Sequence, residues 1–169
     1  MKKGILLLAI FVNCSLLFAV TISDKDTYTN SHNEMDVQES FINNINTHKY
    51  VNVYQMLSDT TLSMISLDIK KISGNSLYGF IADMLNDDLN NLTRTEAINY
   101  YWLLMNGENV DNVDIDKLDY IELLRKERCR IAKLHFGEGS NSHVIELGSL
   151  ARFYEEHQIN NKADSVYQL

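Results

Sequence analysis

The chain has 169 residues, 45% of them hydrophobic and 22% charged, which is typical of a folded globular protein and argues against wholesale disorder. Its formal net charge of −8 disfavours nucleic acid and anionic membranes as main binding targets, because affinity for both comes largely from Lys and Arg neutralising phosphate. A basic peptide or a basic face of another protein is the easier partner. The absence of proline suits a stack of uninterrupted helices.

Residues 1–22 are typical of an export segment, because Lys2 and Lys3 precede an apolar run over residues 5–20. We expect either a cleaved signal peptide or an uncleaved signal anchor, since the run is close to the minimum length that spans a bilayer. In both cases the rest of the chain faces outward, into the periplasm or envelope of a bacterial cell. Lipid attachment at Cys14 is a less favoured alternative, because the residues before it are not small.

Residues 23–34 are polar, without an apolar period, and are predicted to be a linker. Over residues 35–169 apolar side chains recur at helical spacing, which predicts one helical domain. The first three faces are Val37, Phe41, Ile42 and Ile45, then Tyr50, Val51, Tyr54 and Leu57, then Leu62, Ile65, Ile69 and Ile72. Ser73 and Gly74 then predict the end of a helix.

Residues 77–107 form a candidate helical hairpin. Its first helix is predicted from the apolar stripe Leu77, Phe80, Ile81, Met84 and Leu85. After a polar turn over residues 86–91, Thr93 and Glu96 have the spacing of a capping box and predict a helix that runs to residue 107. The expected buried face of that helix consists of Ile98, Tyr101, Trp102 and Met105.

A long helix is predicted over residues 116–136, and it is apolar on two sides. One side carries Tyr120, Leu123, Leu124, Ile131 and Leu134, and the other carries Leu118, Ile121, Ala132 and Phe136. The charged residues Arg125, Lys126, Arg128 and Arg130 are expected to fill much of the remaining surface. Such a helix is expected to lie between two neighbours, as helices do within a solenoid.

The last stretch, residues 143–169, has the most specific spacing. Leu147, Leu150, Ala151 and Tyr154 share one helical face, and Ala163 and Tyr167 lie one turn apart beyond a polar turn. Over residues 131–169 this layout resembles the tetratricopeptide repeat (TPR) family, in particular its kinesin-light-chain-like variety. The resemblance implies an all-α fold of antiparallel helical hairpins, stacked as a short TPR-like solenoid. All six residues are expected to be core of the repeat.

In that family, partners bind on the other side of the first helix of a repeat. The resemblance therefore implies contacts from a stripe formed by Ser149, Arg152 and Glu156, with Glu155 beside it. This side of residues 143–156 is the predicted partner-binding stripe.

The remaining polar groups do not form a recognisable catalytic or metal site. The acidic loop over residues 108–116 lacks the glycine of a calcium-binding EF-hand loop, and we expect it to be a solvated helix start. His135, His143 and His157 lack metal-ligand spacing and are expected on the surface. Cys129 is expected to be buried rather than to pair two chains. We therefore expect no catalysis, no cofactor and no metal.

The sequence favours an exported TPR-like protein that binds another protein. One alternative is the amino-terminal part, or a fragment, of a longer TPR array, because the last predicted helix has only about two turns and lacks a polar capping helix. That uncapped helix could equally be covered by a second copy of the chain. A third reading is a small exported inhibitor or immunity-type protein that binds an envelope enzyme.

Overall fold

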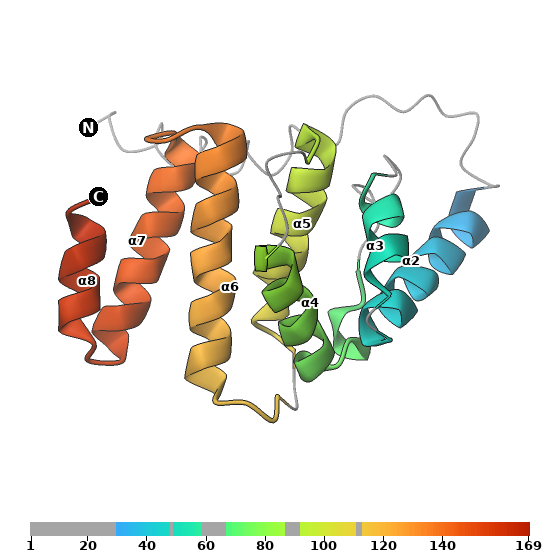
Figure 1. Ribbon diagram of the computed structural model, residues 1–169, viewed down its shortest axis with the longest axis horizontal. Coiled ribbons are helices and arrows are strands. Elements are labelled where there is room, and N and C mark those ends of the chain that lie inside the picture. The colour runs from blue at the N-terminus through green and yellow to red at the C-terminus, as the bar shows by residue number, and fades with distance from the viewer. Residues whose placement is uncertain (1–29, 48, 59–66, 87–91, 111–112) are drawn as a thin grey trace, which may run out of the picture. The chain divides into compact units, whose positions relative to one another are not determined.

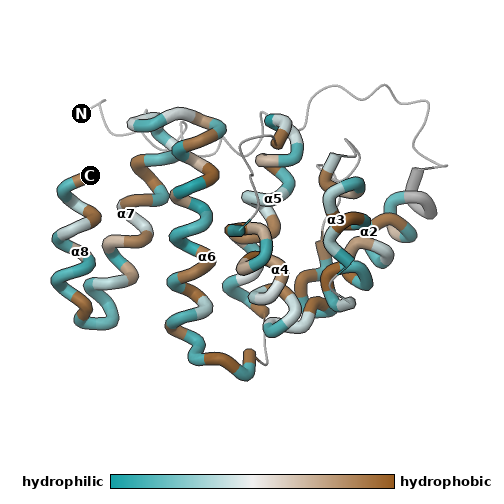
Figure 2. The backbone as a smooth tube through the Cα atoms, viewed as in Figure 1, coloured by the Kyte–Doolittle hydropathy of each residue, from teal (hydrophilic) through white to brown (hydrophobic). Residues whose placement is uncertain are grey.

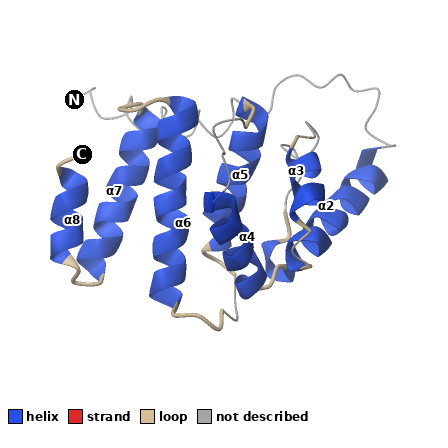
Figure 3. Cartoon of the chain, in the orientation of Figure 1, coloured by secondary structure: helices blue, strands red, loops and turns tan. Residues whose placement is uncertain are grey.

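The computed structural model describes residues 30–47, 49–58, 67–86, 92–110 and 113–169. All regular secondary structure in these residues is helical (Figures 1 and 3), which confirms the all-α prediction. The predicted export segment and most of the predicted linker lie outside the described residues. In the part of the chain that is described, no helix combines the length and the apolar character needed to cross a bilayer.

The helices follow one another along a compact unit that extends from Asn33 to Leu169. They are α2 (Asn30–Asn46), α3 (Tyr50–Leu57), the 3₁₀ helix η2 (Ile69–Lys71), α4 (Gly74–Asn86), α5 (Arg94–Gly107), α6 (Lys117–Ile131), α7 (Asn141–Glu156) and α8 (Asn160–Tyr167). A π-helical turn, η4 (Ala132–Phe136), continues α6, so the predicted long helix over residues 116–136 is present. Helix α2 begins at Asn30, within the predicted linker. Apolar spacing reveals only those turns of a helix that pack against a core, so it could not predict the first turn of α2.

Side-chain caps define the starts of three helices. The predicted capping box is present at α5: the Glu96 N–H donates to Thr93 Oγ1 at 3.3 Å, and the Thr93 N–H donates to Glu96 Oε2 at 2.5 Å. Asp116 Oδ1 accepts from the Leu118 N–H at 2.8 Å at the start of α6, and Ser140 caps α7. These bonds satisfy backbone donors that have no partner within the helix.

Neighbouring and alternate helices pack against each other. Helix α6 contacts α5 and α7, its neighbours in sequence, and also α4, while α3 contacts α5. Figure 1 shows α5, α6, α7 and α8 side by side and running in alternating directions. The prediction that the helix over residues 116–136 lies between neighbours on two sides is therefore confirmed.

Most of the buried apolar side chains of the described residues form two clusters. The main core is built by α2 to α6, and its largest members include Phe41, Phe80, Tyr100 and Tyr120. The smaller one, which we call the C-terminal cluster, consists of Cys129, Leu150, Phe153, Tyr154 and Ala163. Figure 2 shows the apolar positions recurring along each helix that supplies these clusters.

The predicted buried face of α5 is wrong. Trp102 is 53% exposed and Met105 is 38% exposed, and Ile98 and Tyr101 are only partly buried. The buried residues are Ala97, Asn99, Tyr100, Leu103, Leu104 and Gly107. Both sets fit helical spacing, so periodicity could not choose between them. The choice follows from the neighbours of α5, since Gly107 leaves room for Leu77 and Leu124.

Other surface positions also depart from the periodicity. On α3, Val51 is 72% exposed and Val53 is buried in its place. Leu85, Leu118 and Leu134 each lie near the end of a helix and are between 40% and 45% exposed. Residues near a helix end have fewer neighbours, and isolated apolar side chains at a surface are ordinary.

Gly74 begins α4 instead of ending a helix as predicted. A Cβ atom at this position would lie 2.5 Å from Val113 Cγ2, so the glycine allows close packing of the segment before α6. Of the apolar residues predicted to form a helix before it, Ile69 and Ile72 are buried in and beside η2, and Leu62 and Ile65 lie outside the described residues.

Candidate functional site

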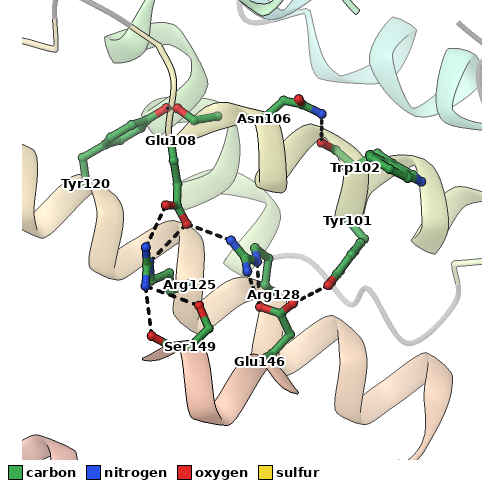
Figure 4. Close-up of polar contacts among 10 residues, drawn as sticks. Tyr101, Trp102, Asn106, Glu108, Tyr120, Arg125, Arg128, Glu146 and Ser149 are labelled. Atoms are coloured by element: carbon green, nitrogen blue, oxygen red, sulfur yellow. Dashed lines mark hydrogen bonds and ion pairs between the residues drawn. The ribbon is translucent and has the colours of Figure 1, made fainter. Parts of the chain in front are cut away.

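Two arginines on α6 converge on one carboxylate at the end of α5 (Figure 4). Arg125 donates to Glu108 through Nε at 3.1 Å and through Nη2 at 2.9 Å. Arg128 donates to the same carboxylate through Nη1 at 2.7 Å. Because Arg125 and Arg128 are three residues apart, they lie on one side of the helix. The carboxylate thus joins the end of α5 to the middle of α6.

The same two arginines also reach α7. Arg128 donates to Glu146 through Nε at 2.7 Å, and Arg125 donates to the Ser149 carbonyl oxygen at 2.9 Å. The Glu146 side chain is 2% exposed, and it also accepts a hydrogen bond from the Tyr101 hydroxyl (Figure 4). We call this set the docking network; it consists of Tyr101, Glu108, Arg125, Arg128, Glu146 and Ser149.

The docking network fixes the protonation state of its tyrosine. Burial raises the pKa of Tyr101 above its ordinary value, and the hydrogen bond to Glu146 raises it further. The hydroxyl therefore keeps its proton across the physiological pH range and remains a donor to Glu146. Sequence reasoning placed Arg128 on the remaining surface, but it is 9% exposed. The spacing of Arg125 and Arg128, which places two cations on one side of α6, is the sequence signal that could have indicated this network.

A second ion pair lies elsewhere on α6. Arg130 donates to Glu127 in a bidentate arrangement, with Nε–Oε2 at 2.7 Å and Nη2–Oε1 at 2.6 Å. The Glu127 side chain is fully buried. Tyr100 lies close to it, and burial together with the Glu127 charge raises the pKa of the Tyr100 hydroxyl.

Most of the side chains predicted to form the core of the last hairpin are buried. Leu150, Ala151, Tyr154 and Ala163 are buried, and Leu147 is half-buried and packs on the C-terminal cluster. Tyr167 is an error in the prediction, because it is 60% exposed. It lies at the end of α8, beyond the packed turns, and its hydroxyl donates to Glu155 Oε1 at 3.1 Å. Phe153 was missed, although it is buried and lies beneath the Arg125 guanidinium, 5.2 Å from the ring centroid.

The structure divides the predicted partner-binding stripe on α7. Ser149 is half-buried, and its backbone carbonyl and hydroxyl oxygens both accept hydrogen bonds from Arg125, so it belongs to the docking network. Arg152, Glu155 and Glu156 are exposed. Arg152 and Glu156 are four residues apart and lie on one face of α7, whereas Glu155 is beside them and contacts Tyr167.

The outward side of α5 carries large apolar side chains. Trp102 and Met105 are exposed and three residues apart, and the half-buried Ile98 lies one turn before Trp102. We call these three residues the α5 face. Figure 4 shows Trp102 beside Tyr101, the residue that connects α5 to Glu146. Exposed tryptophan on a well-packed helix is typical of protein-binding surfaces.

The predicted surface position of the histidines is wrong for His143. This residue is 7% exposed, and its Nδ1 accepts a hydrogen bond from the Gly139 N–H at 3.2 Å. Among the described residues, no group of three or more His, Cys, Asp or Glu side chains is placed to hold a metal ion. Cys129 is 8% exposed, as expected, and burial raises the pKa of its thiol to about 11.

A shallow polar hollow of about 340 Å³ lies along α2 and the start of α3. It is lined by Asp36, Glu39, Ser40, Asn43, Asn44, Thr47 and Lys49. Sites for small molecules are usually concave and largely apolar, with a few convergent polar groups. Because the hollow is lined by polar and charged residues, it does not resemble a typical small-molecule site. The α5 face is therefore the stronger candidate for a binding site.

Glu122 gives the α6–α8 contact a pH dependence. It accepts hydrogen bonds from Lys162 at 2.9 Å and from the Tyr154 hydroxyl at 3.1 Å. Burial by itself would raise the pKa of Glu122, but the hydrogen bonds from Lys126, Lys162 and Tyr154 outweigh it and lower the pKa. A lowered pKa in the folded state contributes stability at neutral pH, and this contribution disappears as Glu122 is protonated on acidification.

Glu122→Gln is therefore expected to be less stable than the wild type at pH 7, and the difference should shrink as the pH falls below 4.5, the ordinary value for this group. Urea unfolding at several pH values, followed by circular dichroism, measures this. Glu156→Gln, at an exposed position of α7, is the matched control. A difference that stays constant between pH 7 and pH 3 would contradict the assignment.

The described residues thus contain an exposed apolar face on α5 and a docking network that includes Tyr101, the residue before Trp102. The chain matches no protein-family model, no curated protein and no solved structure.

Proposed function

We propose that this chain is an exported, TPR-like helical protein that works by binding another protein or peptide and does not catalyse a reaction. The observation that carries the proposal is the α5 face, where Trp102 and Met105 are exposed on a helix whose opposite side is completely buried. A rigid helix presents such side chains with little loss of conformational entropy on binding. Tryptophan is among the residues that contribute most to protein interfaces.

The helix packing supports a TPR-like solenoid. In such arrays each helix packs on the next and on the next but one, and α3 with α5 and α4 with α6 follow this pattern. Helices α7 and α8 form a hairpin in which the small residues Ala151 and Ala163 are buried. The exposed side chains of α8 are mainly polar.

The charge of the chain indicates the kind of partner. With a net charge of −8, the protein is expected to attract a basic protein or peptide and to repel nucleic acid. The exposed Arg152 and Glu156 of α7 are further polar groups that we propose to contact a partner. Charges at the rim of an interface affect the association rate and the salt dependence more than the affinity.

Trp102→Ala is expected to weaken binding of the partner at least about 30-fold, the effect of losing a residue central to an interface. The full chain with a carboxyl-terminal tag captures candidates from envelope extract, and each purified candidate is then titrated against wild type and variants. Trp102 is the only tryptophan of the chain, so its fluorescence should shift to shorter wavelength when a partner covers it.

Leu118→Ala is the control, because Leu118 is an exposed apolar residue at the start of α6. It should leave both the affinity and the thermal midpoint unchanged. If Trp102→Ala and Leu118→Ala bind every purified candidate as the wild type does, the α5 face is not the binding site.

A further inference from the structure

The hairpin of α7 and α8 has an apolar cluster that is separate from the main core. Within this C-terminal cluster, α6 supplies only Cys129 and the partly buried Ile121, and the hairpin supplies the other members. The main core, by contrast, joins α2 to α6 through fully buried side chains such as Phe80 and Tyr100. Apolar packing therefore holds the hairpin together better than it holds the hairpin to α6.

Polar and charged contacts make up much of the remaining attachment. Arg125 bonds to Ser149 of α7, Arg128 bonds to Glu146, and Glu146 also accepts from the Tyr101 hydroxyl. Near the other end, Glu122 accepts from Tyr154 and Lys162. A buried ion pair contributes little net stability, because the cost of removing both charges from water offsets most of their attraction. The hairpin is therefore held to α6 more weakly than the number of its ion pairs and hydrogen bonds suggests.

We propose that the α7–α8 hairpin opens away from α6 as a unit while α2 to α6 stay folded, with the docking network as the latch that holds it closed. Segments with few apolar contacts to the rest of a protein open at a lower free energy than the whole molecule unfolds. Opening breaks both contacts of Glu146 and uncovers Cys129. It also releases Tyr101, the neighbour of Trp102 in the α5 face, although the proposal does not depend on the binding function.

Cys129 reports the open state directly. In the closed state it is 8% exposed, and burial raises the pKa of its thiol to about 11, so an alkylating reagent has little access to a thiolate. The chain contains one other cysteine, Cys14, which Cys14→Ser removes. In the full chain carrying this change, the rate of alkylation then measures how often the hairpin opens.

The first measurement follows Cys129 alkylation and helical circular dichroism over the same range of low urea concentrations. We expect Cys129 to be labelled after a local opening. The free energy of this opening should depend less steeply on urea than the free energy of global unfolding, because opening the hairpin exposes less surface than unfolding the whole unit. Hydrogen exchange is expected to agree with this result. The amides of α7 and α8 should exchange at a lower free energy of opening than the amides of α4 and α5. Equal free energies and equal urea slopes for labelling and for global unfolding would overturn the proposal.

The second measurement uses Arg128→Met, which leaves Glu146 buried without its cationic partner. We expect Cys129 to be labelled about 100-fold faster in this variant, with little change in the helical signal, since an unpaired buried charge strongly favours opening. Lys133→Met, which removes an exposed ion pair with Glu138, should change the rate less than about 5-fold. An unchanged labelling rate in a folded Arg128→Met variant would show that the docking network is not the latch.

Discussion

Phe80→Ala is expected to lower the free energy of unfolding by about 3–5 kcal/mol, the range for removing a large aromatic side chain from a packed core. Phe80 is fully buried on α4. Its ring stacks on Tyr50 with centroids 5.7 Å apart and meets the edge of Tyr100 at 6.2 Å. The substitution removes the buried area and both ring contacts, and it leaves a cavity that α4 and α5 can only partly close.

The thermal midpoint measured by circular dichroism is the appropriate readout, and it should fall by roughly 10 °C or more for a unit of this size. Leu85→Ala on the same helix is the matched control, because Leu85 is 40% exposed and its truncation should change the midpoint little. Similar midpoints for the two variants would mean that Phe80 is not part of a packed core.

Arg130→Met is the second substitution with a large expected effect, about 3–5 kcal/mol, because it leaves the fully buried Glu127 carboxylate without its counter-ion. The cost comes from the unpaired charge and not from the loss of the pair as such. We therefore expect the double variant Glu127→Leu/Arg130→Met to recover most of the lost stability, since apolar residues can replace a buried ion pair at little cost.

Urea unfolding of the wild type, Arg130→Met, Glu127→Leu and the double variant gives the coupling energy between the two side chains. Lys71→Met is the surface control: its ion pair with Asp68 spans 3.8 Å between largely exposed side chains and should contribute less than about 1 kcal/mol. A double variant as unstable as Arg130→Met would show that the packing of the two side chains matters more than the buried charge.

Local signals in the sequence predicted the helices well. The capping box at Thr93 and Glu96 acts within one turn, and it starts α5 as expected. The long helix after Asp116 and the close-packed hairpin at Ala151 and Ala163 are also present. Such features depend on residues a few positions apart, so they can be predicted without knowledge of the fold.

The side of α5 that is buried could not be predicted in the same way. Apolar residues surround most of this helix, and the set that includes Tyr100 and Leu104 fits helical spacing as well as the set that includes Trp102 and Met105. Neighbours far away in sequence decide between them. Periodicity therefore predicts a buried position for the α5 face, which carries the proposed function and is exposed in the structure.

The charged residues show the same limit more clearly. Arg128 and Glu146 are buried, although each belongs to a residue type that normally stays in water. Burial is tolerable only because partners complete the ion pairs, and those partners include residues 18 and 20 positions away from Arg128. No periodicity within one helix contains that information.

Spacing and capping are local properties, so the sequence alone predicted most of the helices, several of their ends and most of the core of the last hairpin. Which face of α5 meets solvent and which charges are buried depends instead on how the helices pack. The same holds for the ion pairs and hydrogen bonds that join the α7–α8 hairpin to α6. These features depend on which helices are neighbours, because a side chain is buried or exposed according to the helix that packs against it.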